Sequence, residues 1–344
     1  MKKFSAILLV GLVFSVLAVS ESSWAAKNFK DDDWTHSFYE DCSSEGGFAN
    51  GSEVKWMKEG DTKFLRFSLA GGQKGNCSRD KIRRKNESSY PYWERSEIMS
   101  GSNKRNKFRL KSGSHYKINL RVRFVEGFAS NKESILQIKS KCTWKGRCSP
   151  LLQLRSIGHY PPGYLRTEVL IKKKGGKKKR DNWSSASTMN DYRQIRNTYT
   201  NDVNVRFSPI THKGKWINII FVVSVTPKEV TLTSQVEAPA GVWTVPIQSI
   251  DIPSGMLDPH IKIGLYRPGS DTIPNPKSTI DFDYIKISKI SKADYISEVN
   301  PFINRLYNNH TDLGSLSSKL ICYRHGLYDG RYIKEAKRRG LNCK

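Results

Sequence analysis

The chain has few acidic residues for its length and no long apolar segment beyond its first residues. Its 344 residues include 32 aspartates and glutamates against 58 lysines and arginines, which gives a formal net charge of +26. A two-carboxylate hydrolase needs an acidic pair across a cleft, and none occurs in the strand-like motifs described below. No later segment reaches the length of a membrane-spanning helix. The sequence therefore disfavours both a two-carboxylate hydrolase and an integral membrane protein.

Several well-known motifs are also missing. The sequence contains no Gly-x-Ser-x-Gly elbow, His-Glu-x-x-His pair, Walker loop, dinucleotide fingerprint or EF-hand-like loop. It contains no RNA- or DNA-binding motif, and its aromatic residues are spread through strand-like segments. We therefore expect no cofactor and no nucleic-acid partner, while a structural calcium ion stays open.

Residues 1–26 have the pattern of a secretory signal peptide. Lys2 and Lys3 are basic, residues 6–19 are apolar, and small residues precede position 27. Without this segment, which holds two lysines and one glutamate, the net charge is +25. Such a charge attracts anions, which outside the cytoplasm means an acidic polysaccharide or an anionic membrane surface. We expect a secreted or periplasmic, monomeric protein without a transmembrane segment.

The cysteine count is even, which suits an oxidising compartment. Zinc binding is the rival interpretation, but the sequence lacks paired Cys-x-x-Cys units, so disulfides are favoured. Pairing of sequence neighbours, one of many connectivities, gives Cys42–Cys77, Cys142–Cys148 and Cys322–Cys343.

Short strand-like segments dominate residues 27–290, and clusters of Gly, Pro, Asn, Asp and Ser separate them. No helical period of useful length occurs there, so we predict one all-β domain, a two-sheet β-jelly-roll sandwich. The predicted strands are residues 64–69, 116–124, 134–139, 151–155, 165–172, 216–225, 229–235, 261–265 and 279–288.

Two segments inside this domain are predicted to lie outside the strands. Residues 172–180 hold seven cations around two glycines, which indicates either an anion-gathering flap or a solvated charged loop. Residues 182–200 are polar and are predicted to form a long loop. Its Tyr192 and Tyr199 are candidates to stack on sugar rings, although packing is an equal alternative.

The composition changes after residue 290. Residues 294–307 have apolar positions at helical spacing, and residues 330–343 are predicted to form a basic helix that ends at Gly340. Residues 291–344 are therefore predicted to be a small, basic, helical C-terminal tail, pinned by a disulfide.

Three strand-like motifs carry the candidate chemistry, and they occur in a fixed order. They are Arg95-Ser96-Glu97-Ile98, Gln137-Ile138-Lys139 and His260-Ile261-Lys262-Ile263-Gly264-Leu265-Tyr266. In the third motif, strand alternation predicts Lys262, Gly264 and Tyr266 on one face and the apolar residues on the other. A cation, a gap and a phenol spaced in this way indicate either the floor of a cleft or an ordinary amphipathic strand.

In this order the motifs resemble those of alginate lyases and their heparinase I and glucuronan lyase relatives, which read roughly R-[ST]-E-[LV], Q-[IV]-H and Y-F-K-A-G-x-Y. The resemblance covers residues 31–290. It implies a jelly-roll polysaccharide lyase that cleaves a uronate-containing polysaccharide by β-elimination.

The resemblance also implies roles for individual residues. Arg95 and Gln137 match positions that stabilise the charge developing on the uronate carboxylate, and Tyr266 matches the tyrosine that transfers protons. Glu97 would orient Arg95. A phenol ordinarily titrates at about 10, so Lys262 and Arg267 are expected to favour the phenolate and to bind substrate.

One position departs from the family pattern. Lys139 stands where the second motif has histidine, and lysine can neutralise a carboxylate but is a poor base at its ordinary pKa. His159, in a neighbouring loop, is the candidate to supply the imidazole. The departure keeps a second hypothesis open, a non-catalytic acidic-polysaccharide-binding protein on the same fold. A third is a structural envelope protein attached through its basic tail.

Overall fold

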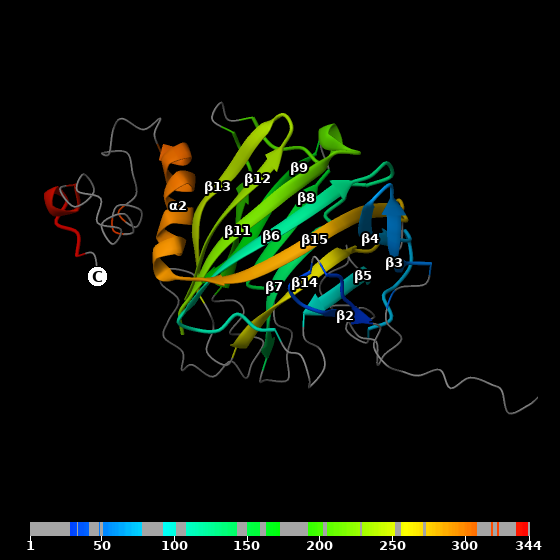
Figure 1. Cartoon of the computed structure of the whole chain (residues 1–344), viewed down its shortest axis with the longest axis horizontal. Coiled ribbons are helices and arrows are strands. Elements are labelled where there is room, and N and C mark those ends of the chain that lie inside the picture. The colour runs from blue at the N-terminus through cyan, green and yellow to red at the C-terminus, as the bar shows by residue number, and fades with distance from the viewer. Residues whose placement is uncertain are drawn as a thin grey trace, which may run out of the picture.

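The computed structural model places the strands of this chain in two antiparallel sheets (Figure 1). The structure describes residues 28–32, 34–40, 48, 51–77, 92–100, 108–142, 150–158, 163–172, 192–201, 205–227, 229–251, 256–270, 273–307, 318, 322 and 335–342. The signal peptide, the basic segment 173–180, His159 and Cys42, Cys148 and Cys343 lie outside these ranges, so the predictions about them stay predictions.

The first sheet has eight strands in the order β1-β2-β5-β14-β7-β8-β9-β10. Their bounds are β1 (Asn28–Phe29), β2 (Phe38–Glu40), β5 (Trp93–Ser100), β14 (Met256–Pro268), β7 (Ser134–Cys142), β8 (Leu152–Ile157), β9 (Tyr164–Lys172) and β10 (Tyr192–Thr198).

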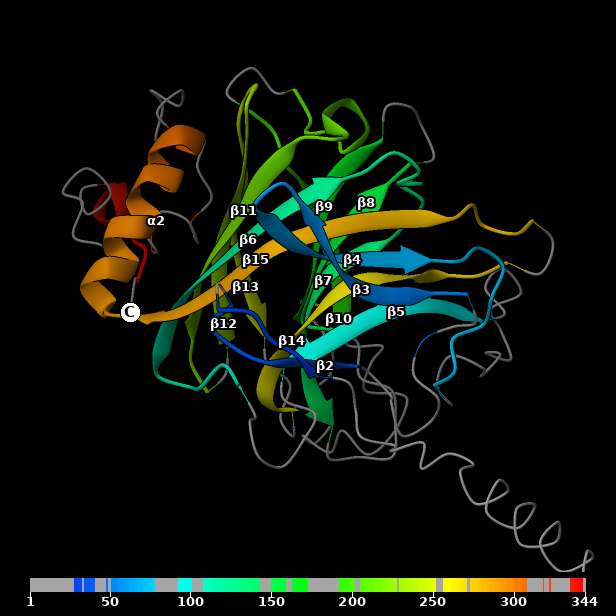
Figure 2. The ribbon, with the colours of Figure 1, turned by 45° about the vertical axis from the view of Figure 1, so that its right-hand side comes forward.

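The second sheet has seven strands in the order β13-β12-β11-β6-β15-β4-β3. Their bounds are β13 (Gly241–Asp251), β12 (Glu229–Ala238), β11 (Trp216–Val225), β6 (Ser114–Phe124), β15 (Ser278–Ile290), β4 (Thr62–Leu69) and β3 (Glu53–Glu59). A short 3-10 helix, η4 (Ile210–His212), precedes β11. Figure 2 shows the two sheets from a second direction, with β14 next to β5.

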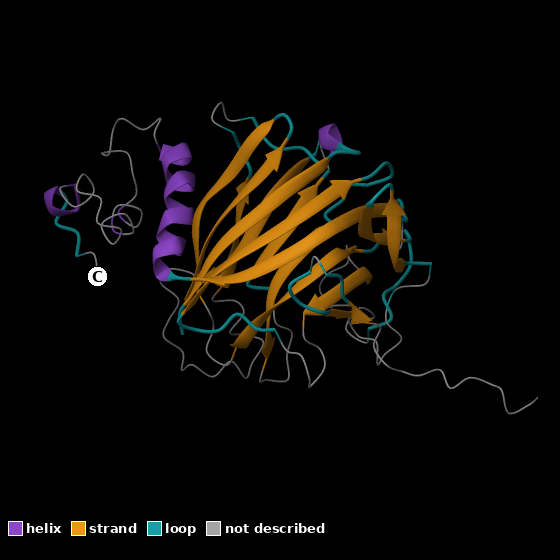
Figure 3. Cartoon of the chain, in the orientation of Figure 1, coloured by secondary structure: helices purple, strands orange, loops and turns teal. Residues whose placement is uncertain are grey.

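The sheets enclose one continuous hydrophobic core. On β14, Ile261, Ile263 and Leu265 are all fully buried in it, as the alternation of that strand predicts. β6 alternates in the same way, because its even-numbered residues from Ile118 to Phe124 face the core. The predicted all-β, two-sheet jelly-roll sandwich is confirmed, since strands make up nearly all of the regular structure (Figure 3).

A long helix, α2 (Lys292–Tyr307), lies against the outer face of the seven-stranded sheet (Figure 1). Tyr295 and Val299 of the helix pack on Ile220 and Val222 of β11 in a small second hydrophobic cluster. The predicted helix 294–307 is therefore confirmed, and packing anchors it to the sheet. No helix in the described ranges is long and apolar enough to span a membrane.

Some predicted boundaries were wrong, and one error concerns the candidate site. β11 has the predicted bounds, but β3 and β13 were not predicted. The predicted loop 182–200 is wrong for residues 192–198, which form β10 and pair with β9 along its length. This strand lies at the edge of its sheet and is rich in polar residues, so it lacked the apolar alternation on which the prediction depended.

The C-terminal prediction is confirmed where the structure describes it. Residues 335–338 are helical, and Gly340 follows with φ of +62°, the left-handed conformation of a helix stop. Cys77 and Cys322 are disulfide-bonded. Their partners are not described, so the pairings and the pinning of the tail stay predictions.

Candidate active site

The three sequence motifs lie on adjacent strands of the eight-stranded sheet. Arg95 on β5 is paired in register with Tyr266 on β14, and Lys262 on β14 is paired with Gln137 on β7. Cross-strand partners share one face of a sheet, and here the alternate residues of each strand fill the core. The motif side chains therefore gather on the outer face, the one that points away from the other sheet.

Glu97 joins this group through charged hydrogen bonds. Its Oε2 accepts from Arg95 Nη1 at 2.6 Å, and its Oε1 accepts from Gln137 Nε2 at 2.7 Å. Lys262 Nζ lies 3.9 Å from Glu97 Oε2. One carboxylate thus holds a guanidinium and an amide in place, and the two cations against one anion leave a positive excess. The orienting role of Glu97 stays a prediction.

Tyr266 lies beside these polar groups and carries aromatic and cationic neighbours. Its ring stacks on Trp93 with centroids 4.9 Å apart and planes 10° apart. The guanidinium carbon of Arg95 lies 4.5 Å from the centre of the Tyr266 ring. These contacts fix the ring plane, so the direction of the phenol oxygen is restricted by its neighbours.

The polar side chains of this group are buried, and its tyrosine is partly exposed to solvent. Arg95, Glu97, Gln137 and Lys262 are each 5% exposed or less, whereas Tyr266 is partly exposed. Electrostatic interactions are stronger where water is excluded. The electrostatic attraction between these donors and a bound ligand carboxylate would therefore be strong.

Position 264 needs a glycine because of its backbone conformation and the close approach of its neighbours, and not because of the outer face of the sheet. Its φ is +125°, and a Cβ there would lie 2.3 Å from the Ser96 carbonyl oxygen and 2.8 Å from the Phe67 ring. The strand is irregular against β7 between Ile263 and Tyr266. The sequence analysis interpreted this glycine as a gap beside Lys262 and Tyr266. The structure shows instead that the missing side chain would collide with the core.

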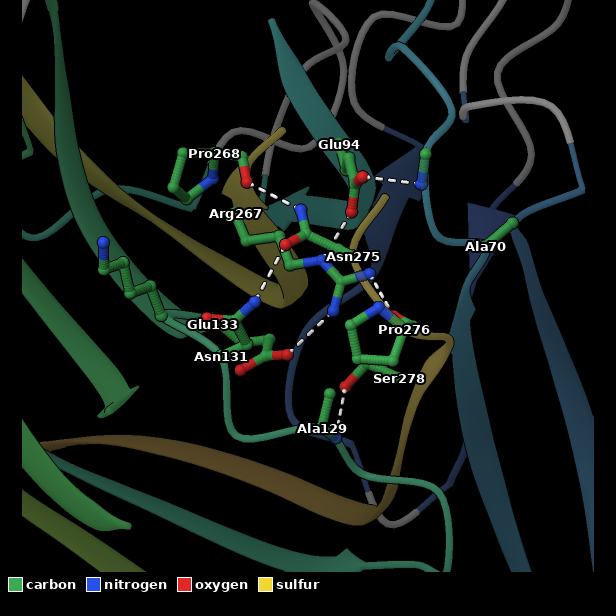
Figure 4. Close-up of polar contacts among 12 residues, drawn as sticks. Ala70, Glu94, Ala129, Asn131, Glu133, Arg267, Pro268, Asn275, Pro276 and Ser278 are labelled. Carbon is green, nitrogen blue, oxygen red and sulfur yellow. Dashed lines mark hydrogen bonds and ion pairs between the residues drawn. The ribbon is translucent and has the colours of Figure 1, made fainter. Parts of the chain in front are cut away.

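The prediction that Arg267 binds substrate is wrong. Arg267 is fully buried on the core side of β14, where its Nη1 donates to Glu133 at 3.0 Å and its Nε pairs with Glu94 at 2.5 Å. Its Nη2 donates to the Pro276 carbonyl, and Figure 4 shows the guanidinium enclosed by these groups. The physical reason is alternation, because Arg267 follows Ile263 and Leu265 inward while Tyr266 points outward.

The remaining predicted residues are only partly located. Lys139 is half-buried on β7, in register with His260 on β14. Tyr192 begins β10, and its side chain lies outside the described residues. Tyr199 is fully buried with its hydroxyl 2.7 Å from Ser234, so it is not free to stack on a sugar. Burial raises the pKa of Tyr199 far above its ordinary value.

The sequence analysis did not include Trp93 in this face, and it named His260 in the third motif without assigning it a role. Both were visible in the alternation, because Trp93 precedes Arg95 by two positions and His260 precedes Lys262 by two. His260 is 6% exposed and is the cross-strand neighbour of Lys139, the position where the family pattern has its histidine.

In the described ranges, no group of three or more His, Cys, Asp or Glu residues is arranged to hold a metal ion. The described polar groups of the site are instead Arg95, Glu97, Gln137, Lys262 and Tyr266. This set can hold an anion and move a proton. It has the parts for carboxylate recognition next to an acid–base group.

Solved structures with a similar arrangement of strands include alginate lyases. Over 76% of this chain and 92% of the other, the alginate lyase from Klebsiella pneumoniae aligns with a TM-score of 0.41 and 13% identity. The alginate lyase from Pseudomonas aeruginosa aligns with a TM-score of 0.41 and 14% identity over 68% of this chain and 86% of its own.

The same comparison finds a different activity on a similar fold. A β-glucanase catalytic domain from Podospora anserina aligns over 67% of this chain and 73% of its own, with a TM-score of 0.36 and 8% identity. No family model matches the chain. No curated protein matches it either. At these identities and TM-scores the likeness carries no argument about function, which has to be argued from the side chains.

Proposed function

We propose that this protein is an exported polysaccharide lyase that cleaves an anionic, uronate-containing polysaccharide by β-elimination. The observation that supports the proposal most is the register that pairs Tyr266 with Arg95 and Lys262 with Gln137 on one face. The excess of positive charge, +25 without the predicted signal peptide, supports an acidic polymer as the partner.

The proposed reaction begins with the uronate carboxylate. Loss of the C5 proton builds negative charge on that carboxylate, so donors aimed at it lower the barrier. Arg95 offers a guanidinium fork, and Gln137 offers the second hydrogen of an amide nitrogen whose first is donated to Glu97. Glu97 is a positioning residue here, because it fixes both donors without facing the substrate itself.

Tyr266 is proposed to carry the proton transfer. It takes the C5 proton, gives a proton to the leaving O4, or does both, and the C4–O4 bond breaks as the C4–C5 double bond forms. Its stacking on Trp93 and the nearby Arg95 guanidinium hold the phenol in one direction. Holding an acid–base group in the right position can lower the activation free energy of a reaction by a large part.

His260 is proposed to supply the imidazole that the second motif lacks. Lys139 replaces the family's histidine, and His260 is paired with Lys139 across the strands. The His260 imidazole would then reach, from β14, the position that the family's histidine occupies on the neighbouring strand, and Lys139 would add a cation there. This makes His260 a stronger candidate than His159, whose position is not described.

The test is an assay of purified protein with alginate, glucuronan and heparin, following the absorbance of the new C4–C5 double bond. We expect product with at least one uronate polymer. Tyr266→Phe should lower turnover about 10²–10⁴-fold with binding retained, because only the proton transfer is removed. Tyr284→Phe, which removes a hydroxyl on the other sheet that bonds to Asn218, is the matched control and should leave turnover unchanged.

A second function, acidic-polysaccharide binding without catalysis, is favoured by one observation, the lysine at position 139. Binding needs cations but no proton transfer. On this alternative, no polymer gives the absorbance change, and Tyr266→Phe alters no measured property. Intact binding with no product from any of the polymers would rule out the lyase and leave this function.

A further inference from the structure

The outer face of the eight-stranded sheet continues past the candidate site as two rows of polar side chains. One row runs from Lys262 and Gln137 to Gln153 on β8, Glu168 on β9 and Arg196 on β10, each paired in register with the next. A second row is formed by Tyr266, Ser134, Arg155, Arg166 and Thr198. A hydrogen bond of 2.7 Å from Ser134 to Gln153 joins the rows.

Three arginines of these rows surround a single carboxylate. Glu168 is buried and accepts from Arg155 Nη1 at 3.1 Å and from Arg166, while Arg196 Nε lies 3.7 Å away. Burial by itself would raise the pKa of Glu168, but Arg155 and Arg166 outweigh it and hold that pKa below its ordinary value. One anion among three cations leaves two positive charges uncompensated.

The arginines also retain donors that protein groups do not use. The Nε atoms of Arg155 and Arg166 are buried and have no hydrogen-bond partner among the residues that the structure describes. Arg196 is 62% exposed and touches Glu168 only loosely. At the same end of β9, Arg206 lies over the ring of Tyr164, 5.1 Å from its centre. One arginine is sufficient for a structural ion pair with Glu168. The positive charge of the other two arginines is therefore suited to binding a second anion.

We propose that Arg155, Arg166 and Arg196 form a second carboxylate-binding subsite, which we call the arginine subsite, for a sugar acid beyond the one that reacts at Tyr266. This deepens the proposed function and rests on it. Guanidinium forks suit carboxylates, and Tyr164 offers an aromatic surface for the sugar ring beside them.

The spacing fixes which part of a polymer the subsite would reach. Neighbouring strands lie about 4.8 Å apart, so β9 is about 14 Å from β14 across the sheet. A chain lying across the strands would place a uronate two or three residues from the reacting one at the arginine subsite. Short oligomers would not reach it, and longer ones would.

The test compares oligomers of alginate with two and with six residues, and measures binding by calorimetry to the full mature chain. Arg196→Gln should weaken binding of the six-residue oligomer about tenfold, the scale of one charged hydrogen bond, and leave the two-residue oligomer unaffected. Glu168→Gln should tighten binding of the six-residue oligomer, because it removes the carboxylate that, among the described residues, pairs with the three arginines. In turnover assays, Arg196→Gln should raise KM for the longer oligomer and leave kcat unchanged.

Arg121→Gln is the matched control, because it removes one arginine from an ion pair with Asp283 on the other sheet. This substitution should change the binding of neither the two-residue nor the six-residue oligomer. The proposed subsite would be overturned if Arg196→Gln lost no more binding affinity than the control, or lost the same affinity for both oligomer lengths. Since calorimetry needs no turnover, length-dependent binding without double-bond formation would support the subsite while contradicting the lyase.

Discussion

Two groups of polar residues lie back to back on β5, β14 and the chain at β7, and they differ in the sign of their formal charge, since the inner group has one cation with two carboxylates and the outer group has two cations with one carboxylate. The inner group, Arg267 with Glu94 and Glu133, faces the core. The outer group contains Arg95, Glu97, Gln137, Lys262 and Tyr266. Both are built from neighbouring residues of the same strands, such as Tyr266 and Arg267, so only strand alternation separates them.

In the inner group each carboxylate oxygen has a donor. Glu94 accepts from the Gly72 backbone and from Arg267, and Glu133 accepts from Arg267 and from Ser156 at 2.9 Å. In the outer group, Glu97 is shared by an arginine, an amide and a lysine. Satisfied buried charges hold a fold together, whereas a cationic excess beside an acid–base group is suited to an anionic substrate.

The largest expected effect is on the inner group. Arg267→Met should lower the free energy of unfolding by about 3–5 kcal/mol, because it leaves Glu94 and Glu133 buried without their cation. Urea denaturation measures this loss. Arg121→Met, which breaks a partly exposed pair, should cost about 1 kcal/mol or less. Equal losses in the two variants would contradict the contrast between the groups.

The next effect should fall on turnover and not on folding. Arg95→Lys should lower kcat about 10²–10³-fold, the cost of one lost charge-stabilising donor, because lysine lacks the guanidinium fork. Glu97 keeps a cation nearby in Lys262, so stability should fall less than in Arg267→Met. Steady-state kinetics and urea denaturation of the same sample measure both quantities. A variant that unfolds as readily as Arg267→Met but turns over normally would reverse the assignment.

A smaller effect should identify the imidazole of the outer group. His260→Gln should lower kcat about 10²-fold, the lower limit for a general acid or base, and should alter the pH profile of kcat/KM. His159→Gln is the matched control and should change neither. If instead the His159 variant loses activity and the His260 variant keeps it, the loop supplies the imidazole.

The smallest effect concerns acid stability at the arginine subsite. The pKa of Glu168 is lower in the folded protein than its ordinary value, so its ionised form stabilises the fold at neutral pH. That contribution is lost as pH falls from the ordinary glutamate range through the lowered pKa. Glu168→Gln removes it, so thermal unfolding of this variant should depend less on pH in that window than unfolding of the parent protein. An unchanged pH dependence would contradict this contribution.

Much of the architecture could be predicted because it depends on local pattern. The period-two alternation of β14 predicted which residues enter the core, and β11 was predicted with its bounds. Edge strands were harder, since β10 has little apolar alternation and draws its stability from pairing with β9. The motifs predicted Arg95, Gln137 and Tyr266 together, while Trp93 was overlooked and His260 was given no role although both follow the same alternation.

The sequence by itself determined the basic charge, the strand-rich pattern and the residue types that a uronate lyase would use, because composition and periodicity are properties of the linear chain. The tertiary structure alone decided that Arg267 pairs with two carboxylates in the interior, that Gly264 avoids a collision with Phe67, and that Arg155, Arg166 and Arg196 converge on Glu168. The physical reason is register, since which side chains meet depends on how strands distant in sequence are paired.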